Sequence, residues 1–261
     1  MTIFEFIGYS GLAVLVYMLG FFIAALIKKD NSIVDIGWGP GFILVAVLTF
    51  LLQEGWTLRH WLVTGLVSVW GARLAVHIGL RSRGRGEDKR YARWRREWGR
   101  WFIPRSFVQI FLLQGVLLMI IAYPIILINH SGRTGWTWLD AAGVLIWVTG
   151  FLFEAIGDYQ LGRFKSDPET KGGIMQSGLW KYTRHPNYFG ESVMWWGIFI
   201  IALNAAYGWT AVISPVVITF LLLKVSGVSL LERDYSGNPE YLDYVRRTNA
   251  FIPWFPKKKK L

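Results

Sequence analysis

Seven long apolar stretches constrain this chain more than any other feature of its sequence. They cover residues 3–27, 33–52, 61–80, 106–128, 138–159, 188–203 and 209–231. Most are about 20 residues long, which is enough to cross ~30 Å of hydrocarbon at ~1.5 Å per helical residue. The fold class we expect is therefore an all-α integral membrane protein with seven transmembrane helices, in a single domain over residues 1–261.

Composition supports this class and excludes several kinds of chemistry. Apolar residues make up 53% of the chain, which is rare for a soluble domain because much of its surface must face water. The chain has no cysteine, so disulfides, thiolate catalysis and Cys-based metal sites are excluded. Its four histidines are scattered along the sequence, and no metal is expected.

The basic residues predict the orientation. Of the 28 Lys and Arg residues, 24 lie in the connections after the first, third and fifth stretches and in the tail. Basic residues gather on the cytoplasmic side, so the N-terminus is predicted outside and the tail in the cytoplasm. If the chain is bacterial, the membrane is the inner one.

Several ionisable residues lie inside the apolar stretches, where charge is costly and usually faces a cavity or a partner. With the predicted orientation, all but Glu5 fall in the cytoplasmic half or at that interface; they include Asp35, Arg73, Glu154, Asp158, Glu191 and Glu232. We expect a polar cavity that opens to the cytoplasm and admits an apolar molecule from the lipid.

The most informative motif runs from Lys181 to Glu191 and contains Arg184-His-Pro-Asn-Tyr188. Pro186 biases the preceding residue away from helix and suits a first helical turn. A helix N-terminus beside Arg184 and His185 favours an anion such as a phosphate.

Two basic segments lie outside the spans. Residues 81–105 combine Arg with an aromatic stripe at helical spacing, Tyr91, Trp94, Trp98 and Trp101. This pattern predicts an interfacial amphipathic helix on anionic lipid headgroups, and no nucleic-acid partner is expected. The tail, residues 232–261, could fold over the cavity, and Lys257 to Lys260 would bind anionic headgroups.

These residues together carry a family resemblance. The chain resembles the steroid 5-alpha reductase C-terminal domain family, specifically its DUF1295-like bacterial branch of uncharacterised membrane proteins. The resemblance rests on Glu154-x-x-x-Asp158-Tyr159, Lys165, Ser177-Gly-Leu-Trp-Lys-Tyr182, Arg184-His-Pro-Asn-Tyr-Phe-Gly-Glu191, Tyr241 and Pro253. It implies a multi-helix membrane reductase that binds NADPH in a cytoplasm-facing cavity.

The resemblance also implies site residues. The expected cofactor contacts are Arg73, Arg85, Glu154, Asp158, Lys165, Tyr182, Arg184, His185, Asn187, Tyr188, Glu191, Glu232 and Tyr241. The steroid enzymes place a Gln-Glu pair early in their second helix, whereas Gln53-Glu54 here falls at the outer end of a span. Asp35 is therefore expected as the acid at that depth, with Tyr182 as an alternative. Asp35, Trp38 and Trp70 are expected to meet the substrate.

Three function classes follow. The first is a reductase that takes hydride from NADPH to a carbon–carbon double bond, conjugated to a carbonyl, in a steroid-like or isoprenoid lipid. The second is a membrane methyltransferase that uses S-adenosylmethionine, because the Arg-His-Pro-x-Tyr signature resembles segments of isoprenylcysteine and phospholipid methyltransferases as well as sterol C14 reductases. The third is a non-catalytic transporter or receptor.

Overall fold

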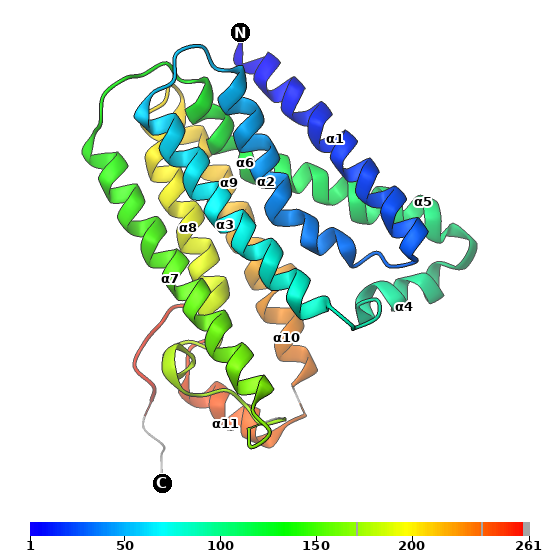
Figure 1. Cartoon of the computed structure of the whole chain (residues 1–261). Helices are drawn as coiled ribbons and strands as arrows, with labels where there is room; N and C mark the ends of the chain where they lie inside the picture. The colour runs from blue at the N-terminus through cyan, green and yellow to red at the C-terminus, as the bar shows by residue number, and fades with distance from the viewer. Residues whose placement is uncertain (171, 236, 258–261) are drawn as a thin grey trace. The chain divides into compact units, whose positions relative to one another are not determined.

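The computed structural model describes residues 1–170, 172–235 and 237–257, and within these ranges it contains helices and no strand (Figure 1). The predicted all-α class is confirmed. The chain divides into two compact units. Unit 1 comprises Met1–Thr137 with Ala202–Ala211, and unit 2 comprises Trp138–Ile201 with Val212–Leu261.

Unit 1 consists of helices packed around α2. Its elements are α1 (Ile3–Lys28), α2 (Ile33–Leu52), α3 (Leu58–Ser82), α4 (Lys89–Trp98), a 3-10 turn (Gly99–Trp101), α5 (Phe102–Ser106), a π-helical turn (Phe107–Leu112) and α6 (Leu113–His130). Helix α2 contacts α1, α3 and α6, and its contact with α3 is the most extensive.

Small residues and one buried amide hold these helices together. A Cβ placed on Gly71 of α3 would lie 2.6 Å from the carbonyl oxygen of Gly39 on α2, so the two backbones touch. On α6, the fully buried Asn129 donates to the carbonyl of Ala46 at 3.1 Å and to the hydroxyl of Thr49 at 2.9 Å. Close packing and hydrogen bonds of this kind drive association where lipid replaces water around the helices.

Unit 2 contains most of the second half of the chain. Its elements are α7 (Trp138–Ser166), a 3-10 turn (Gly178–Lys181), α8 (Pro186–Ala202), α9 (Ile213–Phe220), a π-helical turn (Leu221–Val225), α10 (Val228–Asp234) and α11 (Pro239–Arg247); a further 3-10 turn (Gly208–Val212) precedes α9. Helix α7 continues beyond the predicted end at Tyr159, so Lys165 lies on a helix rather than in a loop.

Helices α7 and α8 run side by side through a seam of glycines (Figure 1). A Cβ on Gly150 of α7 would lie 2.5 Å from the carbonyl oxygen of Gly190 on α8. A Cβ on Gly157 would lie 3.1 Å from the Pro186 ring, and one on Gly143 would lie 2.7 Å from the carbonyl oxygen of Gly197. The glycines recur every seventh residue along α7, which keeps them on one face.

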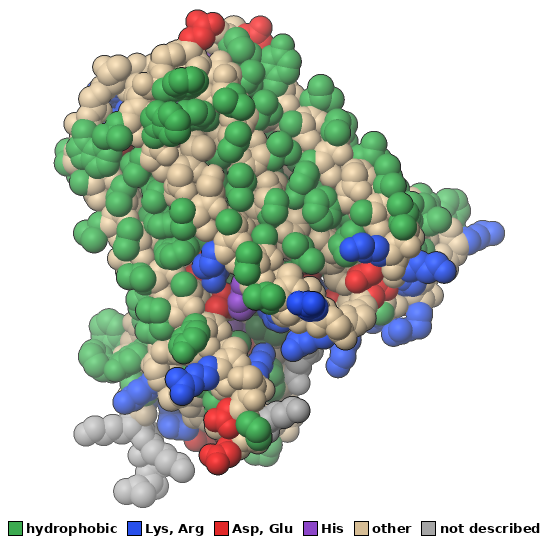
Figure 2. All heavy atoms as spheres, viewed as in Figure 1, with side chains coloured by type: hydrophobic (Ala, Val, Ile, Leu, Met, Phe, Trp, Pro, Cys, Tyr) green, Lys and Arg blue, Asp and Glu red, His purple; other side chains and the backbone are tan. Residues whose placement is uncertain are grey.

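Six helical segments of the described residues are long and apolar enough to cross a membrane, namely Ile3–Lys28, Ile33–Leu52, Leu58–Ser82, Lys89–His130, Trp138–Ser166 and Gly208–Arg233. The predicted stretch at 188–203 corresponds to α8, whose 17 residues span ~25 Å at ~1.5 Å per residue. Seven spans therefore remain a prediction. In Figure 2, apolar side chains cover α1 and α2, and Lys and Arg gather around α4.

The glycine seam predicts a large effect of one added methyl group. Gly150→Ala should destabilise unit 2 by about 1–3 kcal/mol, because the new Cβ overpacks the α7–α8 contact. Thermal unfolding of the detergent-purified protein measures this. Gly162→Ala, on the same helix with nothing within 4 Å of its added Cβ, is the matched control and should stay unchanged or gain stability. Equal melting temperatures for both variants would contradict the tight seam.

Candidate functional site

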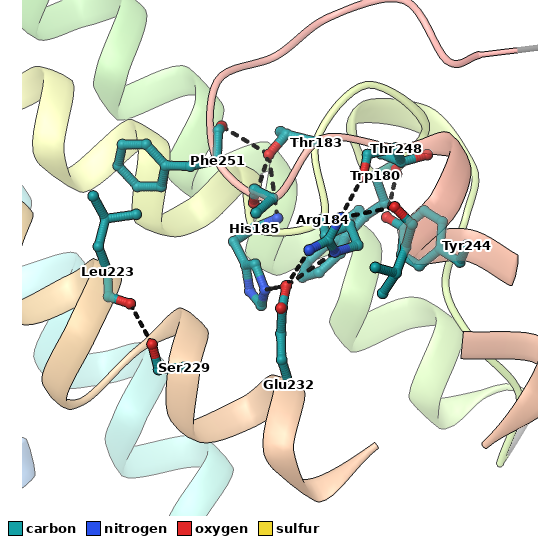
Figure 3. Close-up of polar contacts among 12 residues, drawn as sticks. Trp180, Thr183, Arg184, His185, Leu223, Ser229, Glu232, Tyr244, Thr248 and Phe251 are labelled. Atoms are coloured by element: carbon teal, nitrogen blue, oxygen red, sulfur yellow. Dashed lines mark hydrogen bonds and ion pairs between the residues drawn. The ribbon is translucent and has the colours of Figure 1, made fainter. Parts of the chain in front are cut away.

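A polar cluster in unit 2 joins three segments that are distant in sequence (Figure 3). The Arg184 guanidinium donates to one carboxylate oxygen of Glu232 through Nε at 2.9 Å and Nη2 at 2.6 Å. Its Nη1 donates to the backbone carbonyl of Thr248. The His185 Nε2 lies 3.2 Å from the same Glu232 oxygen. Both side chains are buried, so Glu232 neutralises an Arg184 charge that water hardly reaches.

The local sequence explains how Arg184 and His185 reach this place. Pro186 is the first residue of α8 and keeps His185 out of the helix. The loop before it is tied to the C-terminal segment, residues 248–257. The Arg184 N–H donates to the Asn249 carbonyl at 2.9 Å, and the Thr183 hydroxyl donates to the Phe251 carbonyl at 2.8 Å (Figure 3).

A bend near the end of the last apolar stretch places Glu232. The π-helical turn Leu221–Val225 ends before Gly227, where a side chain would collide with the Leu222 carbonyl. The Ser229 hydroxyl then donates to the Leu223 carbonyl at 2.7 Å and closes the bend (Figure 3). Helix α10 follows, and π-helical turns of this kind are frequent at functional sites.

Beside the cluster lies a cavity of about 100 Å³ within unit 2. Aromatic and apolar side chains dominate its lining, which also includes Lys165, Arg184 and His185. Trp180 belongs to the lining and is fixed by its indole N–H, which donates to the Gly157 carbonyl at 3.1 Å. Pockets for whole drug-sized ligands are roughly 300–1,000 Å³, so this cavity fits one part of a larger molecule.

Two tyrosines of α11 supply hydroxyl groups to this cavity. Burial raises the pKa of Tyr241 to about 12, with the Glu232 charge adding to the rise and Arg184 opposing it. Burial also raises the pKa of Tyr244, whose hydroxyl donates to the Trp180 carbonyl. Both phenols therefore stay protonated at neutral pH.

A second polar pair connects α7 and α8. The Asn187 side-chain amide donates to the Asp158 carboxylate at 3.0 Å. The amide oxygen of Asn187 is buried and has no hydrogen-bond partner among the described residues. Because buried polar atoms are nearly always paired, this acceptor is suited to a donor from a ligand. Glu154, one turn earlier on α7, is also buried and packs against Gly190.

Four other predicted residues of unit 2 differ in exposure. Lys165 is exposed and contributes to the cavity lining. Tyr188 stacks on His185 with ring centroids 5.6 Å apart. Glu191 is half-buried in α8. Tyr182, 36% exposed, lies edge-on to Phe255 at 6.0 Å.

In unit 1, Asp35 is engaged by α4. The buried Tyr91 donates its hydroxyl proton to the Asp35 carboxylate at 2.7 Å, and Arg90 reaches the other oxygen at 3.1 Å. We predicted Tyr91 as part of a lipid-facing aromatic stripe and missed this contact. The helical spacing of Tyr91 with Trp94 and Trp98 carried no sign of a partner 56 residues away.

The remaining predicted residues of unit 1 surround or flank α2. Trp38 stacks on Phe42, and Phe42 meets the buried Trp70 edge-on, with centroids 5.5 and 5.3 Å apart. Arg73 is half-buried in α3, and Arg85 is exposed between α3 and α4. Among the residues that the structure describes, no group of three or more His, Asp or Glu side chains is arranged to hold a metal ion.

Comparison with known proteins decides the family. A family model described as "Protein of unknown function (DUF1295)" matches residues 21–248. The chain belongs to the DUF1295 family. The predicted DUF1295-like resemblance is confirmed.

Two curated relatives are more distant. An uncharacterised protein of the fission yeast Schizosaccharomyces pombe is 25% identical over 181 residues, which are 58% of this chain and 52% of that protein. The 3-oxo-5-alpha-steroid 4-dehydrogenase 1 of Bos taurus is 34% identical over 67 residues, 26% of each chain. The matches thus cover about half of the first relative and a quarter of the second. This weak similarity is consistent with a membrane reductase-like family.

The Arg184 cluster predicts how the C-terminal segment is held. Arg184→Ala should cost roughly 3–5 kcal/mol, because it leaves buried carbonyls and Glu232 without their donor. Limited trypsin digestion should then cut near Arg246 and Arg247 much faster, and the melting temperature should fall.

Arg163→Ala is the matched control, because Arg163 is an arginine of unit 2 whose side chain is exposed on α7. If trypsin digests Arg184→Ala no faster than the control, the prediction that Arg184 holds residues 248–257 in place is wrong.

Proposed function

We propose that the chain is a membrane-embedded reductase. It would use NADPH to reduce a carbon–carbon double bond, conjugated to a carbonyl, in a lipophilic steroid-like or isoprenoid substrate. The observation that carries this proposal is the similarity to bovine 3-oxo-5-alpha-steroid 4-dehydrogenase 1 in a chain whose helices are long and apolar enough for a membrane. That the present chain shares the activity of this relative is our proposal.

The polar groups of unit 2 offer contacts to different parts of a nicotinamide dinucleotide. The buried amide oxygen of Asn187 can accept from an amide or amine, and Lys165 offers a cation at a cavity of aromatic side chains. Tyr241 offers a hydroxyl that stays protonated. Arg184 already donates to Glu232 and Thr248, so its part would be to position the site. NADPH, when bound, supplies a hydride; the protein orients it and excludes water.

In unit 1, the Asp35–Tyr91 pair is the group best suited to deliver a proton. Asp35 accepts hydrogen bonds from Arg90 and Tyr91, which hold its side chain in place. We assign proton delivery to the Tyr91 hydroxyl, whose direction is fixed by its hydrogen bond to Asp35. Tyr182, the alternative acid, is 36% exposed, whereas Tyr91 is 3% exposed.

Several observations support the proposed topology of seven spans with the N-terminus outside. Helix α8 packs along α7, a candidate span, through the glycine seam, so α8 is expected at the same depth. The distribution of Lys and Arg sets the direction. The helix α4 would then lie on anionic headgroups of the cytoplasmic leaflet.

Cofactor binding tests the proposal. NADPH should raise the melting temperature of the purified protein, and a ligand at about 100 times its Kd stabilises by about 2.7 kcal/mol. Asn187→Ala should reduce this shift strongly, since it removes the unpaired acceptor and leaves Asp158 without its donor. Arg246→Ala is the control and should keep the full shift, because this side chain is exposed on α11.

Stabilisation by S-adenosylmethionine alone would replace the reductase with the methyltransferase. No stabilisation by either compound would leave the transporter or receptor class.

The proton-delivery assignment has a separate test. Tyr91→Phe should keep the NADPH-dependent rise in melting temperature while lowering turnover of a lipid enone by about 10²–10⁴-fold, the usual contribution of a positioned acid. Turnover is followed by loss of NADPH absorbance. Trp94→Phe, in the same helix, is the control. Full turnover by Tyr91→Phe would remove Tyr91 from the mechanism.

A further inference from the structure

The C-terminal segment exposes three large apolar side chains that lie close together in sequence on a fixed backbone. Ile252 is 65% exposed, Trp254 67% and Phe255 77%. They lie beyond the last candidate span, so lipid tails around a spanning helix do not account for their exposure. With the neighbouring ring of Tyr182 they form what we call the C-terminal patch. Apolar patches outside a membrane span usually mark an interaction site.

This exposure belongs to an ordered backbone. The Trp254 N–H donates to the Tyr182 carbonyl at 2.9 Å, and the Lys257 N–H donates to the Arg247 carbonyl at 2.9 Å. Pro253, between two patch residues, restricts the chain further. The patch is therefore presented in one conformation, and little conformational entropy would be lost when it binds.

The position of the patch in unit 2 defines its depth. Its backbone is bonded to Tyr182, four residues before Pro186 starts α8. Gly157 of α7 contacts Pro186, so the start of α8 is level with the end of the apolar stretch 138–159. The patch thus lies where unit 2 passes from apolar to charged sequence.

The positively charged residues near the patch indicate which kind of partner it binds. Lys181, Arg246 and Lys257 are exposed near the patch in sequence. Lys258, Lys259 and Lys260 follow and lie outside the described residues. Tryptophan beside lysine is typical of the membrane–water interface, where the ring sits at headgroup level and the ammonium groups meet anionic lipid. Two copies of this patch would instead bring like charges together.

We propose that the C-terminal patch is an interfacial membrane anchor. Ile252, Trp254 and Phe255 insert into the headgroup region of an anionic bilayer, and the adjacent lysines bind its phosphates. The backbone bonds to Tyr182 and Arg184 then hold the loop before α8 at the membrane surface. This proposal does not depend on the reaction that the protein catalyses.

The sequence offers a direct test, because the chain contains no cysteine and any introduced thiol is unique. A nitroxide spin label is attached to Phe255→Cys or, as a second position, to Ile252→Cys. The control is Glu169→Cys, at an exposed polar position after α7. Each protein is reconstituted as a single copy in nanodiscs of phosphatidylcholine with or without phosphatidylglycerol. Accessibility to oxygen and to a water-soluble nickel chelate is measured by electron paramagnetic resonance.

If the patch is an anchor, the ratio of oxygen accessibility to nickel-chelate accessibility should be several-fold higher for both patch labels than for the Glu169→Cys label. The ratio should rise further when phosphatidylglycerol is present. Patch labels as open to the nickel chelate as the control, in both lipid mixtures, would overturn the proposal. Labels shielded only when two copies share a disc would also overturn it, in favour of self-association.

Discussion

The Arg184–Glu232 ion pair is the interaction on which the candidate site of unit 2 depends. One guanidinium holds the loop before α8, the helix α10 and the C-terminal segment together, because each of its donors goes to a different segment or to Glu232. A buried charge pair stabilises only if its remaining hydrogen-bonding groups are satisfied, and here backbone carbonyls and His185 complete it. The cavity beside it exists because these segments meet.

Elsewhere the helices are held by close packing and isolated polar groups. Lipid tails are as apolar as leucine, so hydrophobic burial contributes little between spans. The glycine contacts of α7 with α8 and of α2 with α3 let backbones touch, and Asn129 adds hydrogen bonds inside unit 1. Close helix–helix packing therefore contributes more to association than buried apolar area does. A single added methyl group at a glycine contact should weaken the whole helix pair.

The sequence predicted helices well and their partners poorly. Apolar length alone located six candidate spans, since a bilayer imposes that length on any spanning helix. The Arg-His-Pro-Asn motif also marked the start of α8, because Pro186 restricts its neighbour. The contacts of Arg184 with Glu232 and of Asp35 with Tyr91 could not be predicted from the sequence. They join residues 48 and 56 positions apart, and no local periodicity encodes such pairing.

The C-terminal segment also sets the order of events when the protein is made. Thr183 and Arg184 leave the ribosome long before their partners, which lie 48 to 68 residues further along the chain. Helices α7 and α8 can pair through their glycines during this interval, because all of their contacts are already present. The cavity can close only after residue 251 has been synthesised. The α7–α8 pair can therefore form before the site is complete.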